Sequence, residues 1–192
     1  HIPQTRDELF VMSHCQSRLV GEDEPKHMQA SIARLEQAKT MPKGDGMFKD
    51  TDIHNLLGDL YDITENFPEA IKNYKFVLNN AESAQQKAKA NHSIANALQG
   101  VREQRARETK FKAVEDSVLR AYETTKESAT DLTVRTNVSK DDMVEYLQEG
   151  LKIDTPQVNN SSKGLKIKLS NQLKEALDGK MEQKEKGKAV SR

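Results

Sequence analysis

The chain has no tryptophan, one cysteine and few aromatic residues, which make up 5% of its 192 residues. β-Sandwiches and barrels are built from strands rich in aromatic and β-branched side chains, so this composition argues against those folds. No run of about 18 apolar residues occurs, which argues against a membrane span. Cys15 cannot form an internal disulfide and is typical of a reducing compartment. We therefore expect an intracellular protein, cytoplasmic or nuclear, with no membrane partner.

An excess of charge of one sign is also missing, because 30 basic and 30 acidic residues cancel. The cancellation hides an alternation of blocks along the chain. Residues 45–82 contain eight acidic and three basic residues, and residues 83–112 contain two acidic and seven basic ones. Residues 113–162 are again acidic and residues 163–192 basic. The zero sum gives no global argument for binding nucleic acid or a membrane, but the separate blocks can still recognise charged partners.

Helical periodicity is the main pattern in the first 127 residues. Apolar residues recur near helical spacing over 5–20 and 27–41, and the Gly- and Pro-containing stretch 42–46 then breaks the pattern. Further helices are predicted over about 52–64, 67–82 and 83–100, with Gly100 as a stop, and helix formers continue over 102–127. We interpret residues 1–127 as one helical repeat domain.

The pattern thins after residue 128. Ser139 precedes two acidic residues and an apolar helical face, which predicts a capped helix. Residues 153–164 are expected to form a loop, and residues 165–177 a helix with one apolar stripe of Leu165, Leu169, Leu173 and Leu177. We predict a helical extension over 128–177 and a disordered basic tail over 178–192, since the tail has almost nothing to bury.

The most specific motif lies in residues 51–82. Leu57-Gly58 is followed by Tyr61, and Ala70 is followed four residues later by Tyr74. Small residues let two antiparallel helices approach closely, while the larger ones fill the seam between them. This spacing resembles the tetratricopeptide repeat (TPR), with His54 in place of the family's tryptophan.

The resemblance implies further repeats, because one hairpin cannot bury its own face. Ile94-Ala95 and Leu98 repeat the motif 37 residues downstream, and that step also resembles the longer repeats of LGN-type and tonsoku-type scaffolds. The second helix of this repeat would use Ala113, after about six extra residues around 101–108. The predicted fold is therefore all-α: a short α-solenoid of antiparallel TPR-like hairpins with a helical C-terminal extension.

Repeats of this family act by binding, and their first helices line a groove that receives a peptide or a partner helix. The resemblance places the partner-binding positions at Asp52, Asn55, Asp59, Asp62, Lys89, His92 and Asn96. Chaperone-binding members hold a terminal carboxylate with Lys and Asn, but here Asp59 stands at the corresponding Asn position and would repel it. The groove instead favours a basic or polar partner, unless these charges only solubilise the exposed face.

No catalytic, metal or cofactor motif is present. His14-Cys15 is the one pair that suggests a zinc site or a nucleophile, yet no second cysteine exists and the other histidines lack ligand spacing. Gly44-Asp45-Gly46 is too short for a phosphate loop. We expect neither an enzyme nor a cofactor.

Two other functions compete with a protein-interaction scaffold. A nucleic-acid or chromatin accessory protein would use the C-terminal tail and the basic cluster Arg102, Arg105, Arg107, Lys110 and Lys112. Phe111 is the only aromatic residue among these basic side chains, so base stacking has little support. A structural oligomerisation element would instead use the stripe from Leu165 to Leu177. The preferred hypothesis is a non-enzymatic scaffold that binds a protein or peptide.

Overall fold

The computed structural model of the chain describes residues 5–19, 24–42, 46–125 and 129–190. It is mainly helical and carries one small three-stranded sheet. The chain divides into two units, His1–Gln104 and Arg105–Arg192. The sequence placed its domain boundary at residue 127 instead, a position outside the described residues.

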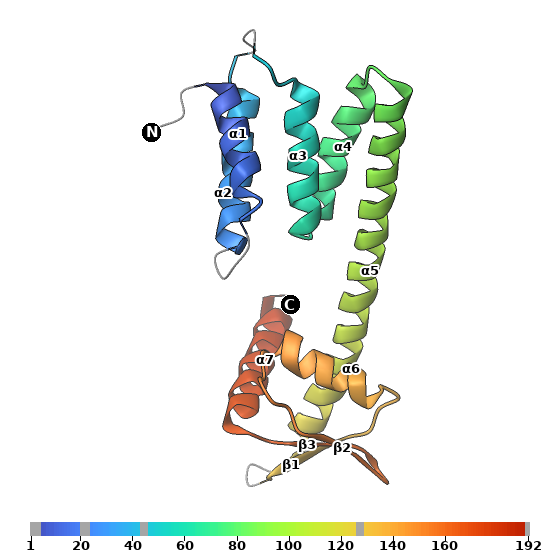
Figure 1. Ribbon diagram of the computed structural model, residues 1–192. Coiled ribbons are helices and arrows are strands. Elements are labelled where there is room, and N and C mark those ends of the chain that lie inside the picture. Colours follow the sequence, from blue (N-terminus) through green and yellow to red (C-terminus); the bar gives the residue numbers. More distant parts are fainter. Residues whose placement is uncertain (1–4, 20–23, 43–45, 126–128, 191–192) are drawn as a thin grey trace. The chain divides into compact units, whose positions relative to one another are not determined.

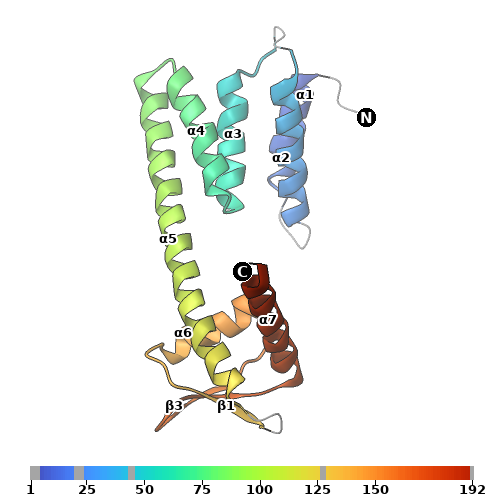
Figure 2. The same ribbon diagram turned by 180° about the vertical axis from the view of Figure 1, so that it is seen from behind.

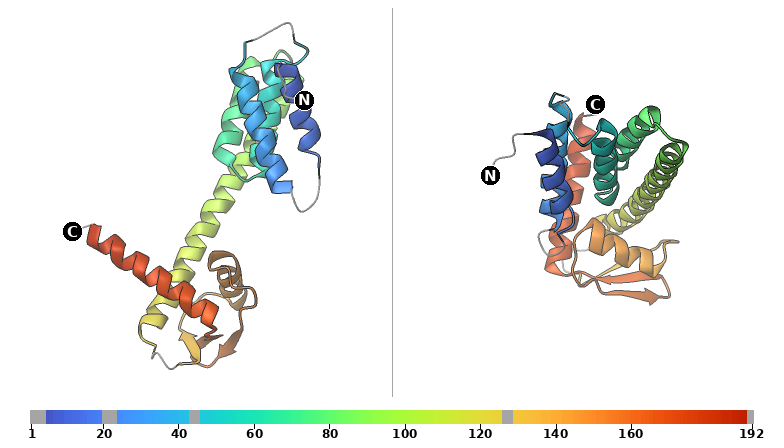
Figure 3. Two further views of the ribbon diagram at one scale, coloured as in Figure 1. Left: turned by 90° about the vertical axis from the view of Figure 1, so that its left-hand side faces the viewer. Right: turned by 45° about the horizontal axis from the view of Figure 1, so that its top comes forward.

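The first unit consists of helices that follow one another in chain order (Figure 1; Figure 3, right). They are α1 (Arg6–Gln16), α2 (Glu24–Thr40), α3 (Asp50–Ile63), α4 (Phe67–Asn80) and the N-terminal part of α5 (Ala84–Glu123). The predicted helices over 52–64 and 67–82 are confirmed to within two residues at each end. Two apolar clusters hold the unit together, one between α1, α2 and α3 and the other between α4 and α5.

The turn between α3 and α4 follows from local chemistry. Glu65 adopts a positive φ of 58°, which reverses the chain after α3, and Pro68 lies in the first turn of α4, where its missing N–H costs nothing. The two helices then pack closely at Gly58. A Cβ atom at this position would lie 2.5 Å from the ring of Tyr74. The small residue in the motif therefore serves the close approach that the sequence predicted.

Helix α5 differs from the prediction, because it runs unbroken for 40 residues through Gly100 and no hairpin forms around 101–108. Gly100 serves packing instead of ending the helix, since a Cβ there would lie 2.5 Å from the ring of Phe67. The predicted register of the second repeat is also corrected. Ala95 and Leu98 are exposed, and Ala97 is buried against α4.

The second unit surrounds the C-terminal part of α5 with a sheet and two helices. Its elements are β1 (Asp131–Val134), α6 (Lys140–Glu145), the π-helical turn η1 (Tyr146–Gly150), β2 (Val158–Ser161), β3 (Gly164–Lys168) and α7 (Asn171–Val190). The strands are antiparallel in the order β1-β3-β2. The end of α5, α6 and α7 all lie on the same face of the sheet (Figures 1 and 2).

The sheet corrects the prediction of a wholly helical extension. Leu132 and Val134 on β1 alternate with exposed residues, as do Leu165 and Ile167 on β3, and this period of two is typical of a strand with one buried face. Val158 on β2 joins them in the core. The sequence predicted a loop over 153–164 because this stretch holds Pro156, Gly164 and the run of Asn and Ser over 159–162, although part of it forms β2.

The four leucines of the stripe do not lie on one helix, and all of them are buried inside the second unit. Leu165 belongs to β3 and Leu169 follows it, whereas Leu173 and Leu177 lie on α7. All four are buried in one core with the end of α5 and with α6. The stripe therefore offers little surface to a second chain, contrary to the oligomerisation hypothesis.

The predicted disordered tail is helical up to Val190 in the structure, and residues 191–192 lie outside the described part. Met181 packs against the core, and two ion pairs join α7 to α5. Lys180 pairs with Glu115 at 2.8 Å, and Lys184 pairs with Glu123 at 2.9 Å. Tertiary contacts of this kind stabilise a helix that composition alone does not predict.

None of the helices in the described ranges combines the length and the apolar character needed to cross a lipid bilayer.

Substituting Gly58→Ala tests the close approach of α3 and α4. Alanine normally stabilises a helix interior by about 1 kcal/mol relative to glycine. Here we expect a loss of about 1–3 kcal/mol, because the added methyl group meets a ring that is only 2% exposed. The free energy of unfolding in urea measures the effect.

The matched control is Gly179→Ala in α7, where an added Cβ meets nothing within 4 Å. This variant should gain the ordinary helix stabilisation. A stabilising Gly58→Ala would contradict the packing described here.

Candidate functional site

A concavity of about 640 Å³ lies in the first unit, and its lining comes mainly from α1, α3 and α5. We call it the first-unit groove. Four of the residues that the sequence assigned to partner binding line it: Asp52, Asn55 and Asp59 from α3, and Lys89 from α5. The remaining lining residues are Phe10, His14, Met47, Phe48, Thr51, Leu56, Val77 and Gln86. Polar and apolar groups therefore meet on one concave surface.

Aromatic side chains form one wall of the first-unit groove. The rings of Phe10 and Phe48 stack with their centroids 4.1 Å apart, and the His14 ring lies parallel to Phe10 at 6.3 Å. Met47 is 82% exposed beside them. An exposed methionine next to stacked rings is an adaptable apolar surface of the kind that binding sites use. This wall was not predicted from the sequence, because Phe48 follows a Gly-rich stretch without a periodic pattern.

The segment before α3 is fixed by α1. The carboxylate of Asp7 accepts hydrogen bonds from the backbone N–H of Met47 at 2.7 Å and of Phe48 at 3.5 Å. Arg6 forms an ion pair with Asp50. These contacts hold the aromatic wall against the start of α3. The position of the segment before α3 is therefore set by α1.

Asp59 is held in place by its neighbours. The hydroxyl of Tyr74 donates to one carboxylate oxygen at 2.8 Å, and the amide of Asn55 donates to the other at 3.4 Å. Burial, together with the nearby Asp59 charge, raises the pKa of Tyr74 well above its ordinary value, so the phenol stays a donor. Asp59 therefore presents a fixed negative charge at the groove.

The other two charged groups differ in availability. Asp52 accepts a hydrogen bond from the backbone N–H of Lys49 at 2.8 Å, so it caps the start of α3. Lys89 is exposed on α5, and no described carboxylate pairs with it. Asp59 and Lys89 thus place one anchored carboxylate and one ammonium group on the same concave surface.

Three predicted partner-binding residues do not line the first-unit groove. Asp62 is half-buried near the end of α3, where burial and the charge of Asp59 raise its pKa. His92 and Asn96 are exposed one turn apart on α5 and hydrogen-bond to each other at 3.3 Å. Asp59 therefore lines the first-unit groove without these three residues.

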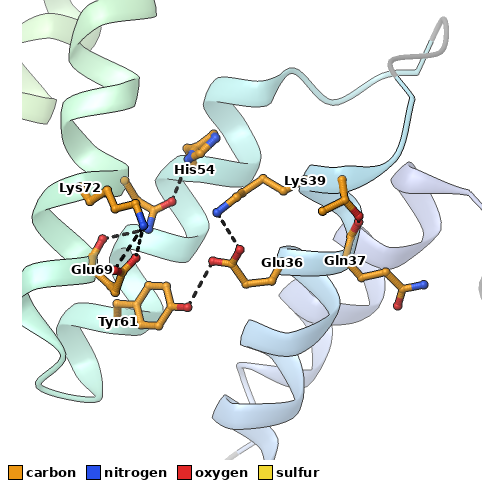
Figure 4. A network of polar contacts seen from close by, with 9 residues as sticks. Glu36, Gln37, Lys39, His54, Tyr61, Glu69 and Lys72 are labelled. Carbon is orange, nitrogen blue, oxygen red and sulfur yellow. Dashed lines mark hydrogen bonds and ion pairs between the residues drawn. The ribbon is translucent and has the colours of Figure 1, made fainter.

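A second polar network joins α2, α3 and α4 (Figure 4). Glu36 accepts from the Tyr61 hydroxyl at 3.2 Å and pairs with Lys39 at 2.6 Å. Burial and the Glu36 charge raise the pKa of Tyr61 to about 12. This network fixes the helices against one another, and Glu36, Lys39 and Tyr61 do not line the first-unit groove.

His54, which the TPR resemblance aligned with a tryptophan, belongs to the same interface (Figure 4). Its ring stacks on Phe76 with centroids 3.7 Å apart, and its Nδ1 lies 2.7 Å from Oδ1 of Asn73. The Asn73 amide nitrogen already donates to the carbonyl of Glu69 at 2.8 Å, so Nδ1 of His54 must carry the proton. The stacked and hydrogen-bonded imidazole thus joins α3 to α4.

The basic cluster is partly neutralised within the second unit. Lys110 pairs with Asp142 at 2.5 Å and with Glu145 at 2.8 Å, and the Lys110 hydrogen bond lowers the pKa of Asp142. Arg107 pairs with Glu145 at 3.5 Å and also with Glu149. Of the predicted phosphate contacts, Arg102, Arg105 and Lys112 remain exposed without such a pair in the described structure.

Cys15 is a free, exposed thiol. Within the described ranges, no three His, Cys, Asp or Glu side chains gather so that they could hold a metal ion.

Comparisons of the chain with models of protein families, with curated proteins and with solved structures found no match.

Burial of His54 should make the stability of the first unit depend on pH. Burial lowers the pKa of His54 below its ordinary value of 6.5, with a smaller contribution from Lys39. The unfolded chain therefore takes up the proton more readily, and the stabilisation present above pH 6.5 is lost as the pH falls through this value toward the lowered pKa. Urea unfolding at pH of about 7.5 and about 5.5 measures the loss.

The control is His54→Gln, which stays neutral and can still donate to Asn73. We expect it to lose less stability than the wild type over the same pH interval. Equal losses in the two proteins would show that another group carries the pH dependence.

Proposed function

We propose that the first unit is a TPR-like interaction module whose groove binds a segment of a protein partner, without catalysis. The observation that carries the proposal is the first-unit groove itself. Residues that the repeat motif assigns to binding, on α3 and α5, line the same concavity as an aromatic wall from α1 and the segment before α3. In TPR proteins the first helices of successive hairpins line such a groove, and α1, α3 and α5 supply most of this lining.

The chemistry of the groove suggests the kind of partner. The rings of Phe10 and Phe48, with the exposed Met47, offer apolar area for one anchoring side chain. Asp59, held by Tyr74 and Asn55, offers a preorganised acceptor for a basic or hydrogen-bonding side chain. Lys89 faces the same space and selects against a partner that is uniformly basic. A segment with an apolar anchor and a nearby Lys or Arg fits these groups.

Affinity capture with the immobilised full-length chain tests the proposal. We expect a protein retained by the wild type to be lost with Asp59→Lys, with its affinity weakened about tenfold or more, because the variant reverses the charge at the preorganised acceptor. Asp62→Lys is the matched control, since it makes the same charge change on the same helix outside the groove lining.

Asp59 also anchors Tyr74, so folding of the variants is checked by circular dichroism. Met47→Glu adds a second route, because this exposed side chain can be changed without disturbing the core. A partner that binds the wild type, Asp59→Lys and Met47→Glu equally well would contradict the proposed groove.

A further inference from the structure

Strand β1 has one unpaired edge. Among the strands in the described part of the chain, it pairs with β3 alone, and the order of strands places it at the side of the sheet. The backbone N–H of Leu169 donates to the carbonyl of Thr130, the residue opposite it, at 2.9 Å. In an antiparallel pair of strands, residues that hydrogen-bond to the partner strand alternate with residues that do not. By this alternation Leu132 and Val134 direct their backbone groups toward β3. The backbone N–H and C=O groups of Asp131 and Thr133 therefore point away from the sheet.

A groove runs along this edge between β1 and α5. Two neighbouring concavities of about 640 and 730 Å³ share Ser117, Arg120 and Arg135 in their linings. One extends along α5 to Thr125 and includes Thr133, and the other continues past the end of β1 to Val138. We call the two together the edge groove. Its walls are a helix and an open strand edge, and both belong to the second unit.

The edge groove carries a positive charge. Arg120, Arg135 and Lys163 line it, are exposed, and form no ion pair with a described carboxylate. Two carboxylates also line it. Asp131 already forms an ion pair with Lys166 at 3.2 Å. The Nε–H of Arg120 donates to the backbone carbonyl of Asp116 at 3.1 Å and not to its carboxylate. The three cations therefore outnumber the carboxylates that could neutralise them.

From the open edge and these cations, we infer that the edge groove binds an extended acidic peptide segment, which adds to β1 as a further strand. The peptide backbone satisfies the outward N–H and C=O groups of Asp131 and Thr133, as in other cases of strand addition. Arg120, Arg135 and Lys163 then select Asp or Glu side chains on the added strand.

The open strand edge distinguishes a peptide from a nucleic acid. A phosphodiester chain offers acceptors to the arginines but has no regular row of donors and acceptors that matches a strand edge. A peptide provides both. The four residues of β1 span roughly 13 Å at 3.3 Å per residue, so the docked stretch is a short one.

A peptide selection tests this inference on the full chain. Random peptides of about ten residues, the length of a long strand, are displayed on phage and selected against the immobilised protein. The most enriched peptide is then synthesised with a fluorescent label, and its Kd is measured by anisotropy. We expect enrichment of Asp and Glu between β-branched residues. Enrichment of peptides poor in acidic residues, or no enrichment, overturns the inference.

Thr133→Pro tests the open edge directly. Proline removes the outward N–H and is tolerated on an edge strand when that N–H does not serve the ladder. Binding should fall about tenfold or more, whereas Thr133→Val, which keeps the N–H and nearly the same shape, should bind within about twofold of the wild type. Peptides methylated at alternate backbone nitrogens provide the same test without changing the protein. Unchanged binding of both the proline variant and the methylated peptides overturns strand addition.

Arg120→Glu and Arg135→Glu test the charge. Each should weaken binding of the acidic peptide about tenfold, because it places a carboxylate against the ligand. Lys112→Glu is the matched control, since it reverses an exposed charge on α5 away from the edge groove. A random single-stranded oligonucleotide serves as the competing ligand. If it displaces the peptide and binds Thr133→Pro as well as the wild type, the surface recognises phosphate and the inference is wrong.

Discussion

Both units depend on the burial of apolar side chains along one uninterrupted helix. Ala90 and Ala97 of α5 are buried in the first unit, and Val114 and Val118 of the same helix are buried in the second. Residues 101–123 contain neither Gly nor Pro, so nothing ends the helix where a repeat would turn back. The apolar face beyond that point is therefore covered by other elements, and the sheet, α6 and α7 form a core on it.

The sequence predicted the helices well where a motif also indicated which two helices pack together. Gly58 and Tyr74 are spaced for a close helix crossing, and the α3–α4 hairpin forms as expected. The sheet was missed because its strands have four or five residues, too few to separate a period of two from helical spacing. Leucines four residues apart, such as Leu165 and Leu169, fit a helix equally well. What decides between the two is strand pairing, and the pairing of β3 with β1 joins residues more than 30 positions apart in the chain.

The candidate site was predictable only in part, for a related reason. Asp59 and Lys89 were predicted because the TPR resemblance assigns binding positions on the first helix of each hairpin, and both line the first-unit groove. The wall that contains Phe48 lies outside that numbering. The ion pairs of the second unit explain part of the alternation of acidic and basic blocks along the chain. In the second unit, Lys110 of a basic block pairs with Glu145 of an acidic block, so opposite blocks neutralise each other there. Arg120 and Arg135 lie within that acidic block, yet no described carboxylate pairs with them on the edge groove.

The open edge of β1 also bears on self-association. An unpaired strand edge is a template on which a second copy of the same chain can add, and such edges promote aggregation when they are long, flat and apolar. Here the edge has four residues and lies beside Arg120, Arg135 and Lys163. Two copies that meet edge to edge would bring like charges together, which opposes their pairing. The cations that favour an acidic strand thus also help to keep the protein from joining to itself.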